Sequence, residues 1–292
     1  VNIQIKKAND ILIRKRNMKT LYVSDLDGTL LTPECRISPF TANTINSLVK
    51  SGMLFSFATA RSRNTALKVT KGIDCRLPMI AYNGVFTADY KSGEILLSSF
   101  FGGGEKEILP ALLDAGISPI VYSYDGKKER FTYLPEALSE GAAEFVATRK
   151  DDSRKTPAAD ESELWRGDIF YFTCIDSAEK LRPLYEKFKE KYRCLYQRDI
   201  YTGRQWLEIM PKGATKANAA LKLKEALGCD KLVAFGDSEN DIDLFAKADE
   251  CYAVSNAVQQ LKNMATAVIG SNSGDAVARF LLERFESENN QA

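Results

Sequence analysis

The fold of this chain is constrained most by an alternation of short apolar runs with helix-forming segments, which appears near both ends and is interrupted in the middle. Residues 20–25 and 53–58 are apolar runs that each precede a helical segment, and residues 78–81 form a third run. Ser38 is in place to cap the first of these helices, and Gly52 to end it. Further apolar runs lie at residues 231–235, 251–254 and 266–269. Such an alternation predicts a parallel sheet with helices on both faces.

The middle of the chain has a different pattern. Residues 85–101 are predicted to form a hairpin, whereas residues 150–168 are polar and are predicted to form a loop. Hairpins mixed with helices are typical of an α+β domain rather than of a continued parallel sheet. We therefore predict an α/β fold with a Rossmann-like core, made of residues 18–85 and 206–292, and an inserted α+β cap domain at residues 86–205.

Charge and residue composition exclude several classes of function. The 40 basic and 39 acidic residues leave a net charge of +1, so no electrostatic attraction to a nucleic acid or an anionic membrane is expected. No apolar run approaches the roughly 20 residues that a membrane-spanning helix needs. The chain contains no histidine, which rules out Ser-His, Cys-His and histidine–metal mechanisms and leaves acid–base chemistry to other side chains, such as carboxylates.

The cysteines and the N-terminal residues bear on the cellular compartment. Six cysteines are scattered without a CxxC pair, which is typical of reduced thiols and predicts a cytoplasmic protein. Residues 1–17 are basic and lack the long apolar core of a signal peptide. We interpret them as an extension and expect the folded domain to begin at Met18; a transit peptide is the alternative.

The sharpest chemical signal is the pentapeptide at the end of the first apolar run, Asp25-Leu26-Asp27-Gly28-Thr29. Residues two apart in an extended segment point to the same side, so Asp25 and Asp27 are expected to face one space. Gly28 permits a tight turn that brings backbone N–H groups close to a ligand. Carboxylates at the carboxyl end of a buried parallel strand lie where open α/β sheets bind ligands. An ordinary polar turn is the alternative for these residues taken alone.

Three further motifs occupy strand ends and helix starts. Thr59 ends one apolar run, Lys216 opens a helix, and a later strand is followed by Gly236-Asp237-Ser238-Glu239-Asn240-Asp241. Asp237 and Asp241 are four residues apart and are expected to lie near one another. Each motif alone is weak, because such a threonine is more often a helix cap and such a lysine more often solvated. Together, in this order, they form a strong signal.

The order DxDGT, Thr, Lys and GDxxND resembles the haloacid dehalogenase superfamily of phosphatases. Arg61, Asn83-Gly84 and Ala253-Val254-Ser255-Asn256-Ala257 are similar to its Cof-like sugar-phosphatase subgroup, which carries a large α/β cap between the second and third motifs. The resemblance covers the chain from Lys19 to about Leu282. It implies a magnesium-dependent phosphatase that works through an aspartyl-phosphate intermediate, with a small phosphorylated metabolite as its partner.

The resemblance implies a role for each motif carboxylate. Asp25 is implied as the nucleophile that attacks phosphorus, and Asp27 as the acid that protonates the leaving oxygen and then as the base for water. The implied ligands of Mg²⁺ are Asp25, the backbone carbonyl of Asp27, and Asp237, with Asp241 in support. Because a carboxylate and a phosphate dianion repel, the reaction needs positive charge, which Mg²⁺ and Lys216 supply.

The residues implied to bind phosphate or substrate come from separate segments. Thr59 and Lys216 are implied to hold the phosphoryl oxygens, and Asn240 to help position the phosphoryl site. Ala60 stands where the family usually has glycine, a difference that bears on substrate fit more than on catalysis. The full set of candidates is Thr59, Ala60, Arg61, Asn83, Lys216 and Asn240.

Two other functions stay open on the same fold. One is phosphoryl transfer to another hydroxyl, as in a mutase, and the other is a catalytically silent module that binds a phosphorylated metabolite. Four intact residues argue against a silent module: Asp25, Asp27, Lys216 and Asp237. Dinucleotide and P-loop nucleotide binding lack their motifs, GxGxxG and GxxxxGK[ST].

A sugar phosphate is the first expectation for the substrate, with pyridoxal phosphate and flavin mononucleotide as alternatives. Specificity is expected to reside largely in the inserted cap. Candidate cap contacts, each more often a packing or surface residue, are Tyr122, Tyr124, Arg130, Tyr133 and Tyr171.

Overall fold

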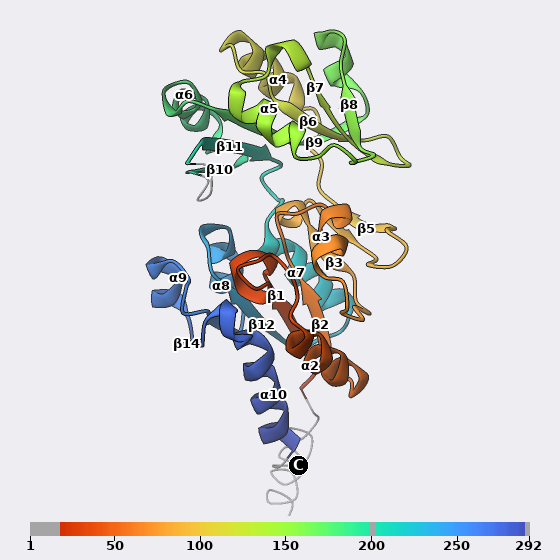
Figure 1. Ribbon diagram of the computed structural model, residues 1–292, viewed down its shortest axis with the longest axis vertical. Helices are drawn as coiled ribbons and strands as arrows, with labels where there is room; N and C mark the ends of the chain where they lie inside the picture. The colour runs from red at the N-terminus through yellow and green to blue at the C-terminus, as the bar shows by residue number, and fades with distance from the viewer. Residues whose placement is uncertain (1–17, 199–202, 290–292) are drawn as a thin grey trace, which may run out of the picture. The chain divides into compact units, whose positions relative to one another are not determined.

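A computed structural model describes residues 18–198 and 203–289 (Figure 1). Packing divides the chain into two compact units. Among the described residues, the first consists of those up to Leu97 together with those from Thr215 on, and the second lies within Ser98–Ala214. Residues 1–17, which the sequence assigns to an extension before Met18, lie outside the described residues.

The first unit is built on a parallel five-stranded sheet. The strand order is β14-β13-β12-β1-β2, and every neighbouring pair is parallel. The central strands are buried along most of their length, which explains why they read as continuous apolar runs in the sequence. The strands are β1 (Thr20–Ser24), β2 (Leu54–Phe57), β12 (Lys231–Gly236), β13 (Glu250–Ala253) and β14 (Ala267–Val268).

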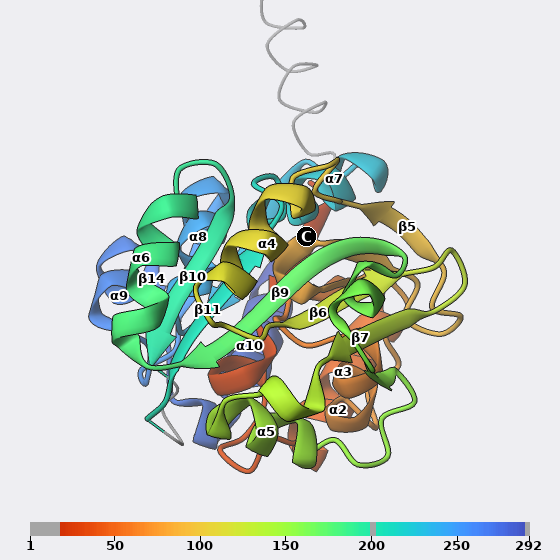
Figure 2. The same cartoon turned by 90° about the horizontal axis from the view of Figure 1, so that it is seen from above.

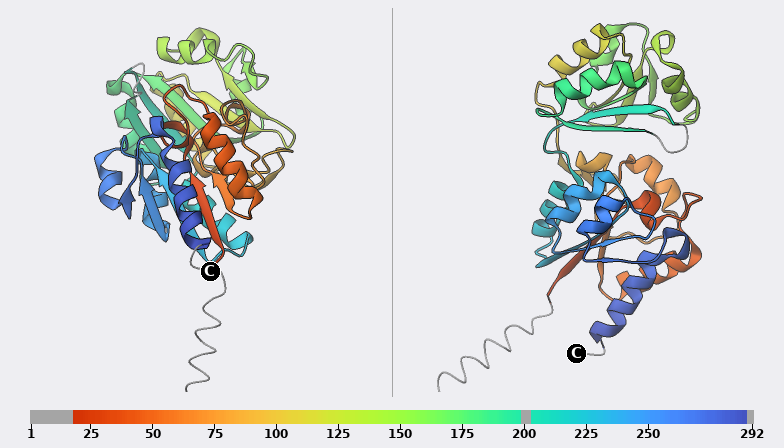
Figure 3. Two further views of the ribbon diagram at one scale, coloured as in Figure 1. Left: turned by 60° about the horizontal axis from the view of Figure 1, so that its bottom comes forward. Right: turned by 90° about the vertical axis from the view of Figure 1, so that its left-hand side faces the viewer.

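Helices lie on both faces of this sheet, as the alternation predicts. α2 packs against α10 on one face, and α7 packs against α8 on the other (Figure 3). The Ser38 hydroxyl accepts a hydrogen bond from the Thr41 N–H at 3.0 Å, so the predicted cap of α2 is confirmed. The helices are α2 (Pro39–Lys50), α3 (Arg63–Val69), α7 (Lys216–Ala226), α8 (Ile242–Lys247), α9 (Gln259–Met264) and α10 (Ala276–Asn289).

A small second sheet completes the first unit. Its strands, in the order β3-β4-β5, are β3 (Met79–Ala81), β4 (Phe86–Ala88) and β5 (Ile95–Ser98). β3 is antiparallel to β4, and a parallel bridge between Ala58 and Ile80 ties β3 to the end of β2. The predicted hairpin at 85–101 therefore pairs with β3, and the first unit extends to Leu97 rather than to residue 85.

The second unit is built on a six-stranded sheet with the order β10-β11-β9-β6-β7-β8 (Figure 2). Its neighbouring strands are antiparallel except for β7 and β8. The strands are β6 (Ile120–Tyr124), β7 (Glu129–Tyr133), β8 (Lys155–Pro157), β9 (Asp168–Asp176), β10 (Arg193–Arg198) and β11 (Gln205–Met210). The helices are α4 (Glu105–Asp114), α5 (Glu140–Ala147) and α6 (Ala178–Phe188).

Two details of this unit differ from the sequence prediction. Residues 150–168 are not a plain loop, because they contain β8 and a 3-10 helix at Glu161–Trp165. β11 pairs with β9 and β10, so the second unit runs to Ala214 rather than ending at residue 205. β8 and β11 are placed by pairing with strands that are distant in the sequence, which the local pattern of residues does not specify.

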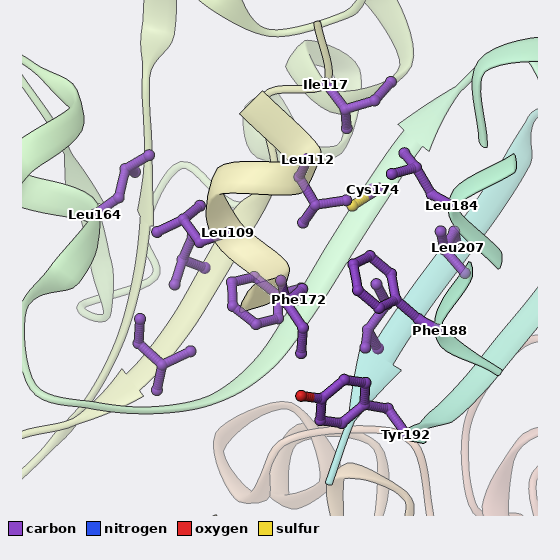
Figure 4. Packing of buried hydrophobic residues seen from close by; sticks show 14 of the residues in the cluster. Leu109, Leu112, Ile117, Leu164, Phe172, Cys174, Leu184, Phe188, Tyr192 and Leu207 are labelled. Atoms are coloured by element: carbon purple, nitrogen blue, oxygen red, sulfur yellow. The ribbon is translucent and has the colours of Figure 1, made fainter. Parts of the chain in front are cut away.

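The core of the second unit lies between its sheet and the helices α4 and α6. Side chains of these helices, including Leu109, Leu112 and Phe188, are buried against Phe172 and Leu207 of the sheet (Figure 4). Burial of each such side chain stabilises the fold by about 1.5–3 kcal/mol. Among the described residues, no helix combines the length and apolar character needed to span a membrane.

Candidate active site

Three carboxylates gather in the first unit, at the carboxyl ends of two neighbouring parallel strands. Asp25 directly follows β1, while Asp237 and Asp241 come just after β12. Each of the three residues offers a carboxylate oxygen, and these oxygens all lie within 4.8 Å of one another. The predicted proximity of these residues is therefore found in the structure.

A buried lysine joins this cluster. The Nζ atom of Lys216 donates to Asp25 Oδ1 at 2.5 Å and to Asp241 Oδ1 at 2.7 Å. Lys216 is positioned at the start of α7, where the Thr215 hydroxyl caps the helix by accepting from the Asn218 N–H. Burial by itself would lower the pKa of Lys216, but the charges of Asp241 and Asp25 outweigh burial and raise that pKa. The two carboxylates therefore favour the ammonium form of Lys216.

One ammonium does not neutralise three carboxylates. Burial, with repulsion from Asp241 and Asp237, raises the pKa of Asp25 well above its usual value although Lys216 opposes the shift. Burial and repulsion from Asp241 raise the pKa of Asp237 to about 7. A divalent cation would relieve this excess negative charge, and an all-oxygen donor set suits Mg²⁺. The residues of the cluster thus fit a Mg²⁺ ion.

The turn after β12 is organised by Asp241. Its Oδ2 atom accepts from the backbone N–H groups of Asp237 at 3.1 Å and Ser238 at 3.2 Å. Asp241 is fully buried, so its two oxygens hold Lys216 and the turn at the same time. A Cβ atom on Gly236 would lie 2.7 Å from Asp241 Cγ, which explains the glycine at the end of the strand.

The turn after β1 approaches Asp237 closely. Gly28 has φ +77°, and a Cβ atom there would lie 2.3 Å from Asp237 Oδ2. The Thr29 hydroxyl donates to Asp237 Oδ1 at 2.9 Å, and Asn256 Nδ2 donates to the Gly28 carbonyl at 2.7 Å. The roles of Thr29 and Asn256 were not predicted, although both residues belong to the motifs that carry the family resemblance.

The side chain of Asp27 lies outside the three-carboxylate cluster. It forms a two-pronged ion pair with Arg61, in which Nε donates to Oδ2 at 2.7 Å and Nη2 donates to Oδ1 at 2.6 Å. This hydrogen bonding raises the pKa of Arg61. The metal role implied for Asp27 concerns its backbone carbonyl, so it does not conflict with this pairing.

The remaining candidate residues for phosphate or substrate binding differ in how far they are exposed to solvent. Thr59 is buried at the end of β2, and its hydroxyl accepts from the Arg61 N–H at 3.1 Å. Ala60 is exposed. Asn83 has a left-handed backbone with φ +53°, and its Oδ1 atom accepts from Asn240 Nδ2 at 3.1 Å. The structure thus brings Asn83 and Asn240 together from distant parts of the sequence.

The candidate contacts in the second unit are mostly packed side chains. Tyr122, Tyr133 and Tyr171 are buried, and Arg130 forms an ion pair within its own hairpin. A carboxyl group that was not predicted lies among them. Burial raises the pKa of Glu208, on β11, to about 7, and a hydrogen bond with Tyr171 opposes that shift.

Comparison of the chain with protein families identifies one that matches most of its length. A family model for haloacid dehalogenase-like hydrolases matches residues 22–281. The chain belongs to this family. The predicted superfamily and its hydrolase class are thereby confirmed, and so is the predicted α/β fold, with a central parallel sheet and further sheets.

Several relatives are phosphatases by name, and two of them match over almost their whole length. One is the 5-amino-6-(5-phospho-D-ribitylamino)uracil phosphatase of Bacillus subtilis, 28% identical over 293 residues, which covers 90% of this chain and 97% of that protein. Another is the HMP-PP phosphatase of Serratia proteamaculans, 26% identical over 269 residues, with 90% and 94% covered. The crystal structure of TM0651 from Thermotoga maritima is similar with a TM-score of 0.74 at 26% identity, covering 91% of this chain and 97% of that one.

Proposed function

We propose that this protein is a magnesium-dependent phosphatase that hydrolyses small phosphorylated metabolites through an aspartyl-phosphate formed on Asp25. One observation carries the proposal: the Asp25 carboxylate, at the carboxyl end of β1, is paired with buried Lys216 and lies within 4.8 Å of two further carboxylates. The relatives named above, phosphatases by name, support the same reaction class.

In the first step, a carboxylate oxygen of Asp25 forms a bond to phosphorus while the bond to the leaving oxygen breaks. Lys216, which already contacts Asp25, offsets the negative charge brought together when carboxylate and phosphoryl group approach. Bound Mg²⁺, held by Asp25 and Asp237 with Asp241 in support, would supply further charge neutralisation at the phosphoryl oxygens.

Asp27 transfers a proton in each of the two steps. It donates a proton to the leaving oxygen in the first step, and in the second it takes a proton from the water that cleaves the aspartyl-phosphate. Division into two steps replaces one difficult hydrolysis by two easier ones. Thr59 and Asn240, beside the cluster, hold and position the phosphoryl oxygens.

The substrate is a small phosphate ester, with a sugar phosphate as the first candidate, and the inserted second unit determines its identity.

We place the protein in the cytoplasm, which its six unpaired cysteines support, all of them in the described part of the chain.

The proposal is tested by the hydrolysis of p-nitrophenyl phosphate with and without Mg²⁺. Asp25→Asn is expected to abolish turnover, whereas Asp114→Asn, which changes an exposed carboxylate at the end of α4, is expected to leave it intact. Asp27→Asn should accumulate a phosphoryl group on the peptide that contains Asp25, detected by mass spectrometry after acid quenching. Turnover that survives in Asp25→Asn would reject the covalent mechanism, and transfer of the phosphoryl group to another hydroxyl group rather than to water would favour a mutase.

A further inference from the structure

The ion pair between Asp27 and Arg61 occupies two groups that the proposed reaction needs elsewhere. Both oxygens of Asp27 accept hydrogen bonds from the Arg61 guanidinium, at 2.6 and 2.7 Å. Asp27 has to direct an oxygen at the leaving group, and Arg61 is a candidate to contact the phosphoryl group. While the pair is intact, neither residue is available for its role.

The backbone of Arg61 is held in place independently of its side chain. Its N–H donates to the Thr59 hydroxyl at 3.1 Å, and its carbonyl accepts from the Tyr82 N–H at 3.1 Å. The guanidinium can therefore exchange partners without movement of the chain. It is anchored beside Thr59, which is itself a candidate ligand of the phosphoryl oxygens.

The two side chains are also free enough to separate. The side chain of Arg61 is 26% exposed and that of Asp27 is 44% exposed. At this exposure water reaches both partners, so a competing anion can reach the guanidinium as well. A phosphoryl dianion offers the guanidinium a two-pronged partner with a greater charge than a carboxylate.

We infer that Arg61 is a positioning residue that holds Asp27 in an inactive orientation. A phosphoryl group that binds the Arg61 guanidinium replaces the Asp27 carboxylate there and so releases it. The inference rests on the proposed function. Arrival of the phosphoryl group draws Arg61 away, and the freed Asp27 carboxyl turns toward the leaving oxygen. Departure of inorganic phosphate restores the pair, so Asp27 acts only while a phosphoryl group is bound.

Equilibrium binding of orthophosphate to the full-length protein in saturating Mg²⁺ tests this exchange. Affinity is measured by calorimetry for the wild type, Asp27→Asn, Arg61→Met and the double variant. If phosphate must displace Asp27 from Arg61, Asp27→Asn should tighten binding by about 5-fold when Arg61 is present and by less than about 2-fold when it is absent. Arg61→Lys keeps the positive charge but lacks the guanidinium that donates two parallel hydrogen bonds. In that background, Asp27→Asn should tighten orthophosphate binding by a factor between these two values.

A matched control separates this coupling from a general change of charge. Arg63, two residues further on, donates to the carbonyls of Tyr90 and Lys91 instead of to Asp27. Arg63→Met removes the same charge nearby, and the gain from Asp27→Asn should persist in that background. Thermal unfolding establishes that each variant is folded.

Three results would overturn the inference: an equal gain with and without Arg61, no gain in Asp27→Asn, or no measurable orthophosphate binding in any folded variant. The assay involves no turnover, so its outcome is separate from that of the hydrolysis assay. A protein that binds phosphate with this coupling but hydrolyses no ester would reject the proposed function alone, and an active phosphatase without the coupling would reject the positioning role alone.

Discussion

Lys216 and Asp241 form a completely buried ion pair with 2.7 Å between Nζ and Oδ1, although one opens α7 and the other lies in the turn after β12. The same ammonium also contacts Asp25. Lys216 therefore connects Asp25, the proposed nucleophile, to the turn that carries Asp237.

Substitution of Lys216 tests whether its contacts with Asp25 and Asp241 are needed for stability and activity. In Lys216→Met, buried carboxylates lose their ammonium partner, so without Mg²⁺ the free energy of unfolding should fall by about 3–5 kcal/mol. Turnover of p-nitrophenyl phosphate should fall by at least about 100-fold. Urea unfolding and steady-state kinetics provide the measurements. Lys224→Met is the control, because Lys224 pairs with Asp249 at the surface and its loss should cost less than about 1 kcal/mol. Equal losses in the two variants would contradict the central role of Lys216.

The carboxylate cluster should make stability depend on Mg²⁺. A ligand that binds only the folded protein at 100 times its Kd raises the free energy of unfolding by about 2.7 kcal/mol. We expect Mg²⁺ to raise the Tm of the wild type and EDTA to reverse the effect. Asp237→Asn should abolish most of this shift, whereas Glu239→Gln, an exposed carboxylate in the same turn, should preserve it. A shift that is unchanged in Asp237→Asn would place the ion elsewhere.

Gly28 should be needed for activity more than for stability. Gly28→Ala combines an unfavourable positive φ with a Cβ atom 2.3 Å from Asp237 Oδ2, so it should displace the carboxylate. Gly116→Ala has a similar φ, +70°, with no atom within 4 Å of the added Cβ. Both variants should lose about 1–2 kcal/mol of stability through backbone strain, while only Gly28→Ala should lose turnover and Mg²⁺ affinity. Comparable activity in the two variants would show that the close approach to Asp237 is not required.

Glu208 should make stability depend on pH. Burial raises its pKa from an ordinary 4.5 to about 7, so the folded protein binds more protons at this site than the unfolded chain across that window. The free energy of unfolding should therefore decline as pH rises from about 4.5 to about 7, by at most about 3 kcal/mol. Glu208→Gln should flatten the decline and be the more stable protein above pH about 7.

Urea unfolding at a series of pH values, in saturating Mg²⁺, measures this difference. The metal is present so that the carboxylates of the candidate active site contribute equally to all the proteins compared. Glu136→Gln, which changes an exposed carboxylate of the same unit, should retain the wild-type slope. A slope that Glu208→Gln leaves unchanged would mean that Glu208 is ionised in the folded protein throughout the range.

Much of the candidate site was predictable, because its carboxylates directly follow apolar runs. The strands β1 and β12 are recognisable from their buried residues, and parallel neighbours bring their carboxyl ends to one edge of the sheet. Asp25 and Asp237 therefore had to lie close together once both strands joined the same sheet. The cap of α2 by Ser38 was equally local, because capping depends on residues within one turn of the helix.

The boundaries of the two units were less predictable. β11 is an apolar run near the returning core pattern, yet it pairs with β9 and β10 of the second unit. β4 pairs with β3, and β5 lies next to β4 in the same sheet, so both belong to the first unit. A strand pattern specifies which face of a strand is buried but not which partner it pairs with.

The sequence by itself determined the family, the order of strands and helices in the core, and the chemical identity of the candidate catalytic groups, because each depends on short segments and their succession. The tertiary structure decided the partners of those groups: Arg61 for Asp27, Thr29 for Asp237, and Asn83 for Asn240. These contacts join turns that lie between 34 and 208 residues apart in the chain. Their geometry depends on strand register and on left-handed turns, which no local pattern of residues specifies.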